Sequence, residues 1–264
     1  TESINRVFRE ALRCESEEDV AKAALKVAEE LTGSKFGFVG FVNQEGLFDT
    51  IGLSNPGWDA CQLNGSQAAT LIKGMAVRGL WGEVIKQGRS SIVNDPATHP
   101  SRVGIPDGHP PLTAFLGVPL KRNEKTVGMI ALGNKAGGFL AEDQEAIELL
   151  GSAFHEALLR KRMELEIQRQ SWLKTLQSEL AQELLGDLAS MEIGRRAISF
   201  LCQRLEIPAG LLYVSDETGV VTPLGRYAFS EKAKVRSFRP GDGLVGQSLL
   251  EKREIRLGEL PEAY

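Results

Sequence analysis

The chain has 264 residues, of which 42% are hydrophobic and 25% charged, and its formal net charge is −4. This composition is typical of a globular protein, and the length allows one large domain or two smaller domains with separate cores. No stretch approaches the ~20 apolar residues of a membrane span, and no secretory signal is recognisable, so we expect a cytoplasmic protein. The mild acidity argues against nucleic acid or an anionic membrane as the main partner, because both select a basic surface.

The cysteines and histidines do not form a pattern typical of a zinc or catalytic site. The three cysteines are too far apart for a CxxC motif, and we interpret them as buried thiols in a reducing compartment. No GxSxG motif accompanies the three histidines. The sequence therefore predicts no metal site and no catalytic residue. The cysteines are Cys14, Cys61 and Cys202.

An internal repeat is the most informative feature of the sequence. The segment GLWGE at 79–83 is matched by GLVGQ at 243–247, an offset of 164 residues. Upstream, Leu31 and Gly46 match Leu205 and Gly219 at offsets of 174 and 173. The first copy therefore carries nine or ten extra residues, which we place within 52–75.

The predicted elements recur in the same order in both halves. Ser16, with acidic residues behind it, is typical of a helix N-cap. In the first half we expect a helix over 20–31, a strand over 36–42 and a turn over 43–46. In the second half we expect a helix over 193–205, a strand over 211–214 and a turn over 215–219, with Ser190 in the place of Ser16.

The rest of the first half ends in a long helix. We expect a short helix over 82–87, a strand over 91–93, a loop over 94–111 and a hairpin of strands over 114–120 and 126–132. A helical pattern then runs through 142–185 without a proline. Leu158, Leu165 and Trp172 recur every seven residues. A solvated connecting helix is one interpretation; we favour a parallel, dimer-forming coiled coil, because an apolar stripe must be buried somewhere.

Several motifs of the first half resemble the GAF sensor domains of bacterial signalling proteins, including the histidine kinases of two-component systems. These motifs are NDP at 94–96, FLGVPL at 115–120 and GMIAL at 128–132, together with GLWG at 79–82. The resemblance implies an α+β fold with a six-stranded antiparallel sheet, dimerising helices on one face and a ligand pocket on the other. It implies a first GAF-type domain over 1–157, a shared connecting helix over 142–185, and a second, C-terminally incomplete GAF-type domain over 172–264.

One signature of this family concerns cyclic nucleotides. GAF domains that bind them carry an Asn-Lys…Phe…Asp-Glu pattern, which this sequence matches except that Gln144 replaces the final Glu. The resemblance implies that the lysine and aspartate form a structural ion pair. A cyclic nucleotide ligand is the alternative interpretation. The matching residues are Asn134, Lys135, Phe139 and Asp143.

The pocket candidates come from the elements that would surround a ligand. The aromatic and methionine side chains among them have two interpretations: they pack in the core, or they form a surface that contacts a ligand. The histidines flank Arg102 in the long loop, where they hold the loop backbone, grip an anionic ligand with the arginine, or bind a metal. The candidates are Trp58, Trp81, Asn94, His99, Arg102, His109, Phe115 and Met129.

These observations predict the non-catalytic sensory module of a multidomain signalling protein. A small ligand in the first pocket would shift the long helix of a parallel homodimer, which would pass the change to a downstream output domain. The ligand is unknown: a cyclic nucleotide or another small molecule fits, and the sequence requires none. The alternatives are a GAF-type reductase that uses a pocket histidine and cysteine, and a dimerisation scaffold without a ligand.

Overall fold

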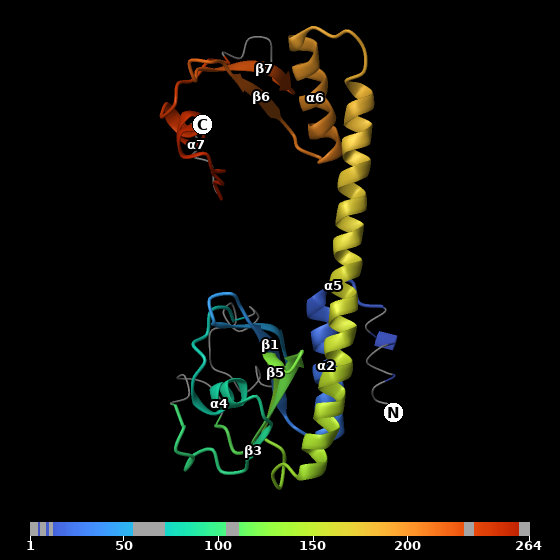
Figure 1. Cartoon of the computed structure of the whole chain (residues 1–264), viewed down its shortest axis with the longest axis vertical. Helices are drawn as coiled ribbons and strands as arrows, with labels where there is room; N and C mark the ends of the chain where they lie inside the picture. The colour runs from blue at the N-terminus through green and yellow to red at the C-terminus, as the bar shows by residue number, and fades with distance from the viewer. Residues whose placement is uncertain are drawn as a thin grey trace. The chain divides into compact units, whose positions relative to one another are not determined.

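The computed structural model of the chain describes residues 5, 9–10, 13–54, 72–103, 111–229 and 235–258. The chain divides into two compact units, Thr1–Ile167 and Gln168–Tyr264. Figure 1 labels most of the elements of both units. Two pocket candidates, Trp58 and His109, and the cysteine Cys61 lie outside the described residues.

The first unit is built on an antiparallel sheet of five strands in the order β2-β1-β5-β4-β3. Three helices accompany the sheet, and the longest of them continues beyond Ile167. The strands are β1 Phe36–Val42, β2 Phe48–Leu53, β3 Ser91–Val93, β4 Phe115–Arg122 and β5 Lys125–Gly133. The helices are α2 Glu17–Thr32, α4 Gly79–Gln87 and α5 Ala141–Glu183.

The described residues form five strands in this sheet, one fewer than the six that the family resemblance implied. Beside β2, where a further strand would pair, the described chain forms one isolated bridge between Phe48 and Met75. Close by, the Thr50 hydroxyl accepts a hydrogen bond from the backbone N–H of Ile72 at 2.8 Å and donates one to the Ile72 carbonyl at 3.0 Å. The backbone N–H of Thr50 also donates to the Ile72 carbonyl at 2.9 Å, so side-chain and backbone bonds together join the described residues 72–75 to β2.

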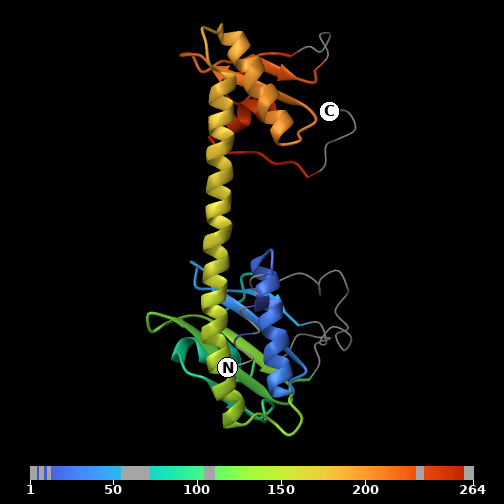
Figure 2. The ribbon, with the colours of Figure 1, turned by 90° about the vertical axis from the view of Figure 1, so that its right-hand side faces the viewer.

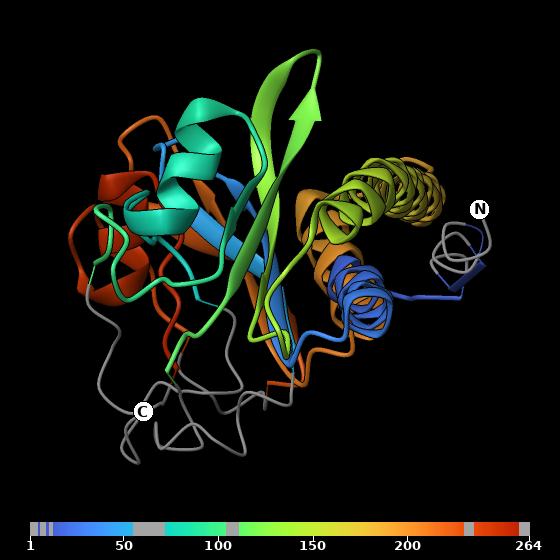
Figure 3. The ribbon, with the colours of Figure 1, turned by 90° about the horizontal axis from the view of Figure 1, so that it is seen from below.

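The sheet separates two layers of helix. Figure 3 shows α4 on one face and α2 with α5 on the other, and Figure 2 shows α2 and α5 side by side. The main core lies between this helix pair and the sheet. α2 begins with the predicted N-cap at Ser16, which forms a capping box: Ser16 and Asp19 each accept a bond from the other's backbone N–H, both at 3.1 Å.

The first half of α5 contributes to this core and leaves another stripe uncovered. Leu158 is completely buried against the sheet, so the predicted dimer seam through Leu158, Leu165 and Trp172 is wrong at its first position. A helix that packs on a sheet must turn one apolar stripe inward, and a spacing of seven alone cannot tell that stripe from a dimer seam. The most exposed large apolar residues of α5 are Leu149, Met163 and Ile167, with exposures of 62%, 66% and 64%.

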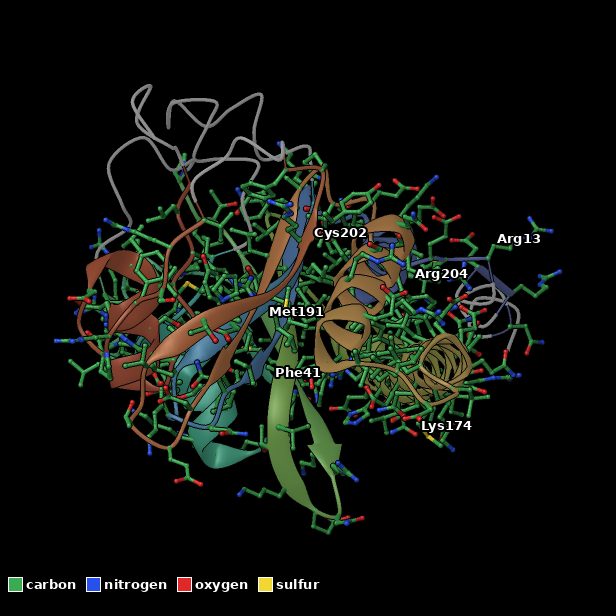
Figure 4. The ribbon with its side chains drawn as sticks, turned by 90° about the horizontal axis from the view of Figure 1, so that it is seen from above. Arg13, Phe41, Lys174, Met191, Cys202 and Arg204 are labelled. Atoms are coloured by element: carbon green, nitrogen blue, oxygen red, sulfur yellow. The ribbon has the colours of Figure 1, made fainter. Side chains whose placement is uncertain are left out.

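The second unit contains the end of α5, a helix, a two-stranded sheet and a short helix. Its helix caps correct one detail: the N-cap of α6 is Ala189, without a side-chain bond, and Ser190 is the first helical residue. Arg204 of α6 pairs with Glu179 of α5 at 2.6 Å; Figure 4 labels Arg204 with Met191 and Cys202 on α6. The elements are α6 Ser190–Arg204, β6 Gly210–Ser215, β7 Val221–Tyr227 and α7 Gly243–Glu251.

The hairpin turns of the two units have the same hydrogen bonds. In the first unit, Oδ1 of Asn43 accepts bonds from the backbone N–H groups of the residues two and four positions later, Glu45 and Leu47. In the second unit, Oδ1 of Asp216 accepts from the N–H groups two and four positions later. Both turns then reach a glycine with positive φ, +78° at Gly46 and +81° at Gly219.

Contacts between helix and hairpin also correspond. The helix α2 approaches β2 so closely that a Cβ at Gly52 would lie 2.8 Å from the Cβ of Ala21. At the equivalent place in the second unit, a Cβ at Gly225 would collide with the backbone of Gly194 on α6. The isolated bridge beside β2 likewise has a counterpart beside β7, between Val221 and Phe238.

Candidate functional site

The face of the sheet under α4 carries an apolar cluster. Phe48 of β2 is its centre, with ring contacts to Phe38 at 5.9 Å and Trp81 at 5.3 Å between centroids. Trp81 lies on α4, which begins at Gly79 with a φ of +69°. The buried members of the cluster are Phe48, Val84, Val93, Phe115, Met129 and Ala131.

Three of the predicted pocket residues meet in this cluster. Trp81 comes from α4, Phe115 from β4 and Met129 from β5. Met129 is completely buried and Phe115 is 4% exposed, whereas Trp81 is half-buried. The first two side chains therefore form part of the packed core; of the predicted aromatic residues that the structure describes, Trp81 keeps an accessible surface.

The polar candidates form a separate group on the segment 94–103, which follows β3. The ring Nδ1 of His99 accepts a bond from the backbone N–H of Ser101 at 3.2 Å. The hydroxyl of Ser101 donates to the carboxylate of Glu83 on α4. His99 thus contacts the loop backbone, and the segment is fastened to α4.

Arg102 and Asn94 do not join the apolar cluster. The exposed guanidinium of Arg102 donates to the carbonyl of Ala97 at 3.4 Å, within its own loop. The side chain of Asn94 is bonded to the backbone of Phe139, just before α5. Neither contact was visible in the sequence, because each partner is set by the path of the loop.

The residues of the Asn-Lys…Phe…Asp pattern lie around the connection from β5 to α5. The Lys135 ammonium contacts both carboxylate oxygens of Asp143, at 2.8 and 2.6 Å. Asn134 holds the end of the long loop: its Oδ1 accepts from the N–H of Thr113 and its Nδ2 donates to the Pro111 carbonyl, both at 2.8 Å. The four matching residues therefore all lie in or beside the connection from β5 to α5.

On the opposite face, α5 carries a buried histidine. His155 is 7% exposed, and its Nδ1 has no hydrogen-bond partner among the described residues. Its ring meets Phe41 of β1 edge-on at 5.9 Å between centroids. Burial lowers the pKa of His155 below its usual 6.5, and the positive charges of Arg162 and Arg122 lower it further.

Among the described residues, no group of three or more His, Cys, Asp and Glu side chains is placed to hold a metal ion. Cys14 packs against the core on the helix side of the sheet, away from the α4 cluster, and Cys202 belongs to the second unit. Within the described ranges, no helix combines the length and apolarity needed to cross a membrane.

Comparison with known proteins places these features in a family. The model of the GAF domain family matches residues 14–158, which is more than half of the chain. A curated protein of Methanosarcina acetivorans, the methyl sulfide methyltransferase-associated sensor, is 29% identical over 148 residues. That match covers 55% of this chain and 14% of the sensor, so the chain corresponds to a small part of its relative.

Two solved structures show the same fold. The GAF domain of a phosphoenolpyruvate-protein phosphotransferase from Coxiella burnetii superposes with a TM-score of 0.51 at 17% identity, over 62% of this chain and 94% of that one. The bacteriophytochrome RpBphP3 from R. palustris superposes with a TM-score of 0.56 at 13% identity, over 88% of this chain and 51% of that one. The chain therefore belongs to the GAF domain family.

Proposed function

We propose that the chain is the sensory, non-catalytic module of a multidomain signalling protein, and that α5 carries its signal. The observation that supports this most is the path of α5. Its first half is buried against the sheet of the GAF unit, and the same helix continues past Ile167 to Glu183. The sensor from Methanosarcina acetivorans supports the same role through its name.

A small ligand binds on the α4 side of the first unit. Support comes from Trp81, the half-buried aromatic residue beside the apolar cluster, and from the polar segment 94–103, which is fastened to α4. Arg102 lies on this segment with an exposed guanidinium and gives the site a preference for anionic groups. A cyclic nucleotide has this chemistry and is one candidate.

The second unit is a GAF-type copy, over 172–264. Its hairpin turn, its helix-to-strand contact at Gly225 and its isolated bridge have counterparts in the first unit. The superposition on the bacteriophytochrome supports a second copy too, because it covers 88% of the chain and therefore extends beyond the first unit.

The module acts as a parallel homodimer through α5. In place of the seam that begins at Leu158, the dimer buries the exposed stripe of Leu149, Met163 and Ile167. Leu149 and Met163 are two heptads apart and Ile167 follows four residues later, a spacing that two parallel helices can share. A ligand then changes the output by binding one arrangement of the helix pair more tightly than the other. An output domain receives the change downstream.

A dimerisation scaffold without a ligand is the second candidate. It is favoured by one observation: Phe115 and Met129, two of the predicted pocket residues, are buried in the packed core. Under this alternative the α4 side is filled by side chains.

Native mass spectrometry of the purified chain separates the two candidates. The sensor predicts a small molecule that stays with the chain and that is lost in Trp81→Ala. Trp172→Ala is the matched control, because it removes the same side chain from an exposed position on α5. A chain that carries no bound mass, in buffer and after addition of cyclic AMP or cyclic GMP, would support the scaffold.

A further inference from the structure

The side chain of Asn94 bridges two parts of the first unit that are 45 residues apart in sequence. Its Nδ2 donates to the carbonyl of Phe139 at 3.0 Å, and its Oδ1 accepts from the N–H of the same residue at 2.8 Å. An asparagine amide offers a donor and an acceptor side by side, which matches the two backbone groups of one residue. Aspartate offers no donor, and an aliphatic side chain offers neither group.

The backbone next to Phe139 is shaped to receive this amide. Gly138 has a φ of +85°, and a Cβ at this position would lie 2.7 Å from Cγ of Asn94. A residue with a side chain would therefore displace the amide as well as strain its own backbone. Glycine makes the close approach of Asn94 and Phe139 feasible.

The connection that holds Asn94 also forms the beginning of α5. Phe139 is 2% exposed, and Leu140 follows it directly before the helix. Oδ2 of Asp143 accepts from the N–H of Leu140 at 2.7 Å, while Lys135 neutralises the carboxylate. The position of Phe139 therefore fixes the first turn of α5.

The other end of the Asn94 segment is fastened to α4. Ser101 donates to Glu83, and Val103 lies against Gly79, where a Cβ would be 2.5 Å from Cγ2 of Val103. The segment 94–103 thus runs from α4 to the entry of α5 along a chain of bonded groups. Its position depends on contacts at both ends.

We propose that Asn94 is a coupling residue, which transmits a change in α4 and the segment 94–103 to the first turn of α5. The biological meaning of this coupling rests on the proposed function, since α4 borders the proposed ligand site. The coupling itself needs no ligand and is measured in the chain alone. Asn134, which ties the far end of the loop to the same connection, keeps the fold closed when Asn94 is changed.

Hydrogen exchange measured by mass spectrometry on the full chain tests the coupling. Glu83→Gln weakens the attachment of the segment to α4, at a partly buried contact. We expect exchange to rise about fivefold in 95–103 and also in 140–147, the scale of one lost hydrogen bond. Asn94→Ser alone raises exchange in 140–147, because serine is too short to reach Phe139.

The double variant, Glu83→Gln with Asn94→Ser, gives the decisive comparison. In the Asn94→Ser background, the further change Glu83→Gln should raise exchange in 95–103 and leave 140–147 unaltered. Asn43→Ala is the matched control: it removes an asparagine with two backbone bonds from the β1–β2 turn, and 140–147 should not respond.

Two results would overturn the proposal. One is that Glu83→Gln opens 95–103 while 140–147 keeps its wild-type exchange; the other is that its effect on 140–147 is the same with and without Asn94. If Asn94→Ser does not fold, Glu83→Gln alone still shows whether exchange in 140–147 responds when 95–103 opens. Neither result bears on whether a ligand binds, which the native mass measurement reports separately.

Discussion

Nζ of Lys135 lies 2.6 Å from Oδ2 of Asp143, across the connection between β5 and α5. Asp143 is 8% exposed, and its carboxylate also accepts a bond from the N–H of Leu140. The pair therefore joins the last strand of the sheet to the first turn of the long helix. It is a partly desolvated ion pair, so losing one member leaves the other without compensation.

Lys135→Met should lower the free energy of unfolding by about 2 kcal/mol, because it leaves a buried carboxylate without its cation. The measurement is urea denaturation of the purified chain. Lys22→Met is the control: Lys22 pairs with Glu18 at the same 2.6 Å, but the two side chains are 54% and 43% exposed. That exposed pair should contribute less than about 0.5 kcal/mol. Equal losses of unfolding free energy in the two variants would show that the Lys135 pair stabilises the fold no more than the exposed pair does.

The matched glycine contacts predict matched effects in the two units. Gly52→Ala should force α2 away from β2, and Gly225→Ala should force α6 away from β7, since the new Cβ meets the helix in each case. Each substitution should cost more than about 1 kcal/mol, and each effect should stay in its own unit. Hydrogen exchange of α2 and α6 checks this. Gly258→Ala, with nothing within 4 Å of its Cβ, is the control. If hydrogen exchange of α6 in the Gly225→Ala variant equals that of the wild-type chain, the result would argue against a repeated architecture.

His155 predicts a pH dependence of stability. Its pKa in the folded unit is lowered by burial first and by Arg162 and Arg122 next, whereas Glu156 opposes the shift. The unfolded chain therefore binds a proton near pH 6.5 that the folded unit does not bind. The stability due to neutral His155 is complete above pH 6.5 and declines as the pH falls below 6.5.

The test compares the wild-type chain with His155→Gln, which keeps a polar side chain without a titration in this range. Between pH 7.5 and 5.5, urea denaturation should show a larger loss of unfolding free energy for wild type than for the variant. The two chains contain the same carboxylates, so the contribution of these groups to the pH dependence of stability cancels in the comparison. Parallel pH profiles would mean that the surroundings of His155, which include Phe41 and Arg162, tolerate the charged ring.

The sequence predicted the elements of this fold better than their contacts. Periodicity and turn residues are local, so the helix from 141 to 183, the β4–β5 hairpin and the N-cap at Ser16 could be predicted closely. Burial is not local: Leu158 fits a seven-residue repeat, and only the sheet packed against α5 shows that it belongs to the core.

The same limit applies to the candidate site. Phe115 and Met129 meet Trp81 of α4 because the alternation of side chains along β4 and β5 sends both to the face that α4 covers, which a pattern can predict. The bond of Asn94 to Phe139 spans 45 residues and depends on the space that Gly138 leaves. No local pattern records such a contact, so the sequence did not predict that Asn94 is bonded to the entry of α5.

Light scattering of the purified chain at micromolar concentration tests the central role of α5 most directly. The account predicts a particle of twice the mass of one chain, and a single-chain mass for Met163→Glu, which places a charge in the proposed dimer stripe. Leu250→Glu, at a similarly exposed apolar residue of the second unit, should remain dimeric. A wild-type chain with the mass of one copy, or a Met163→Glu variant that stays dimeric, would contradict signalling through paired α5 helices.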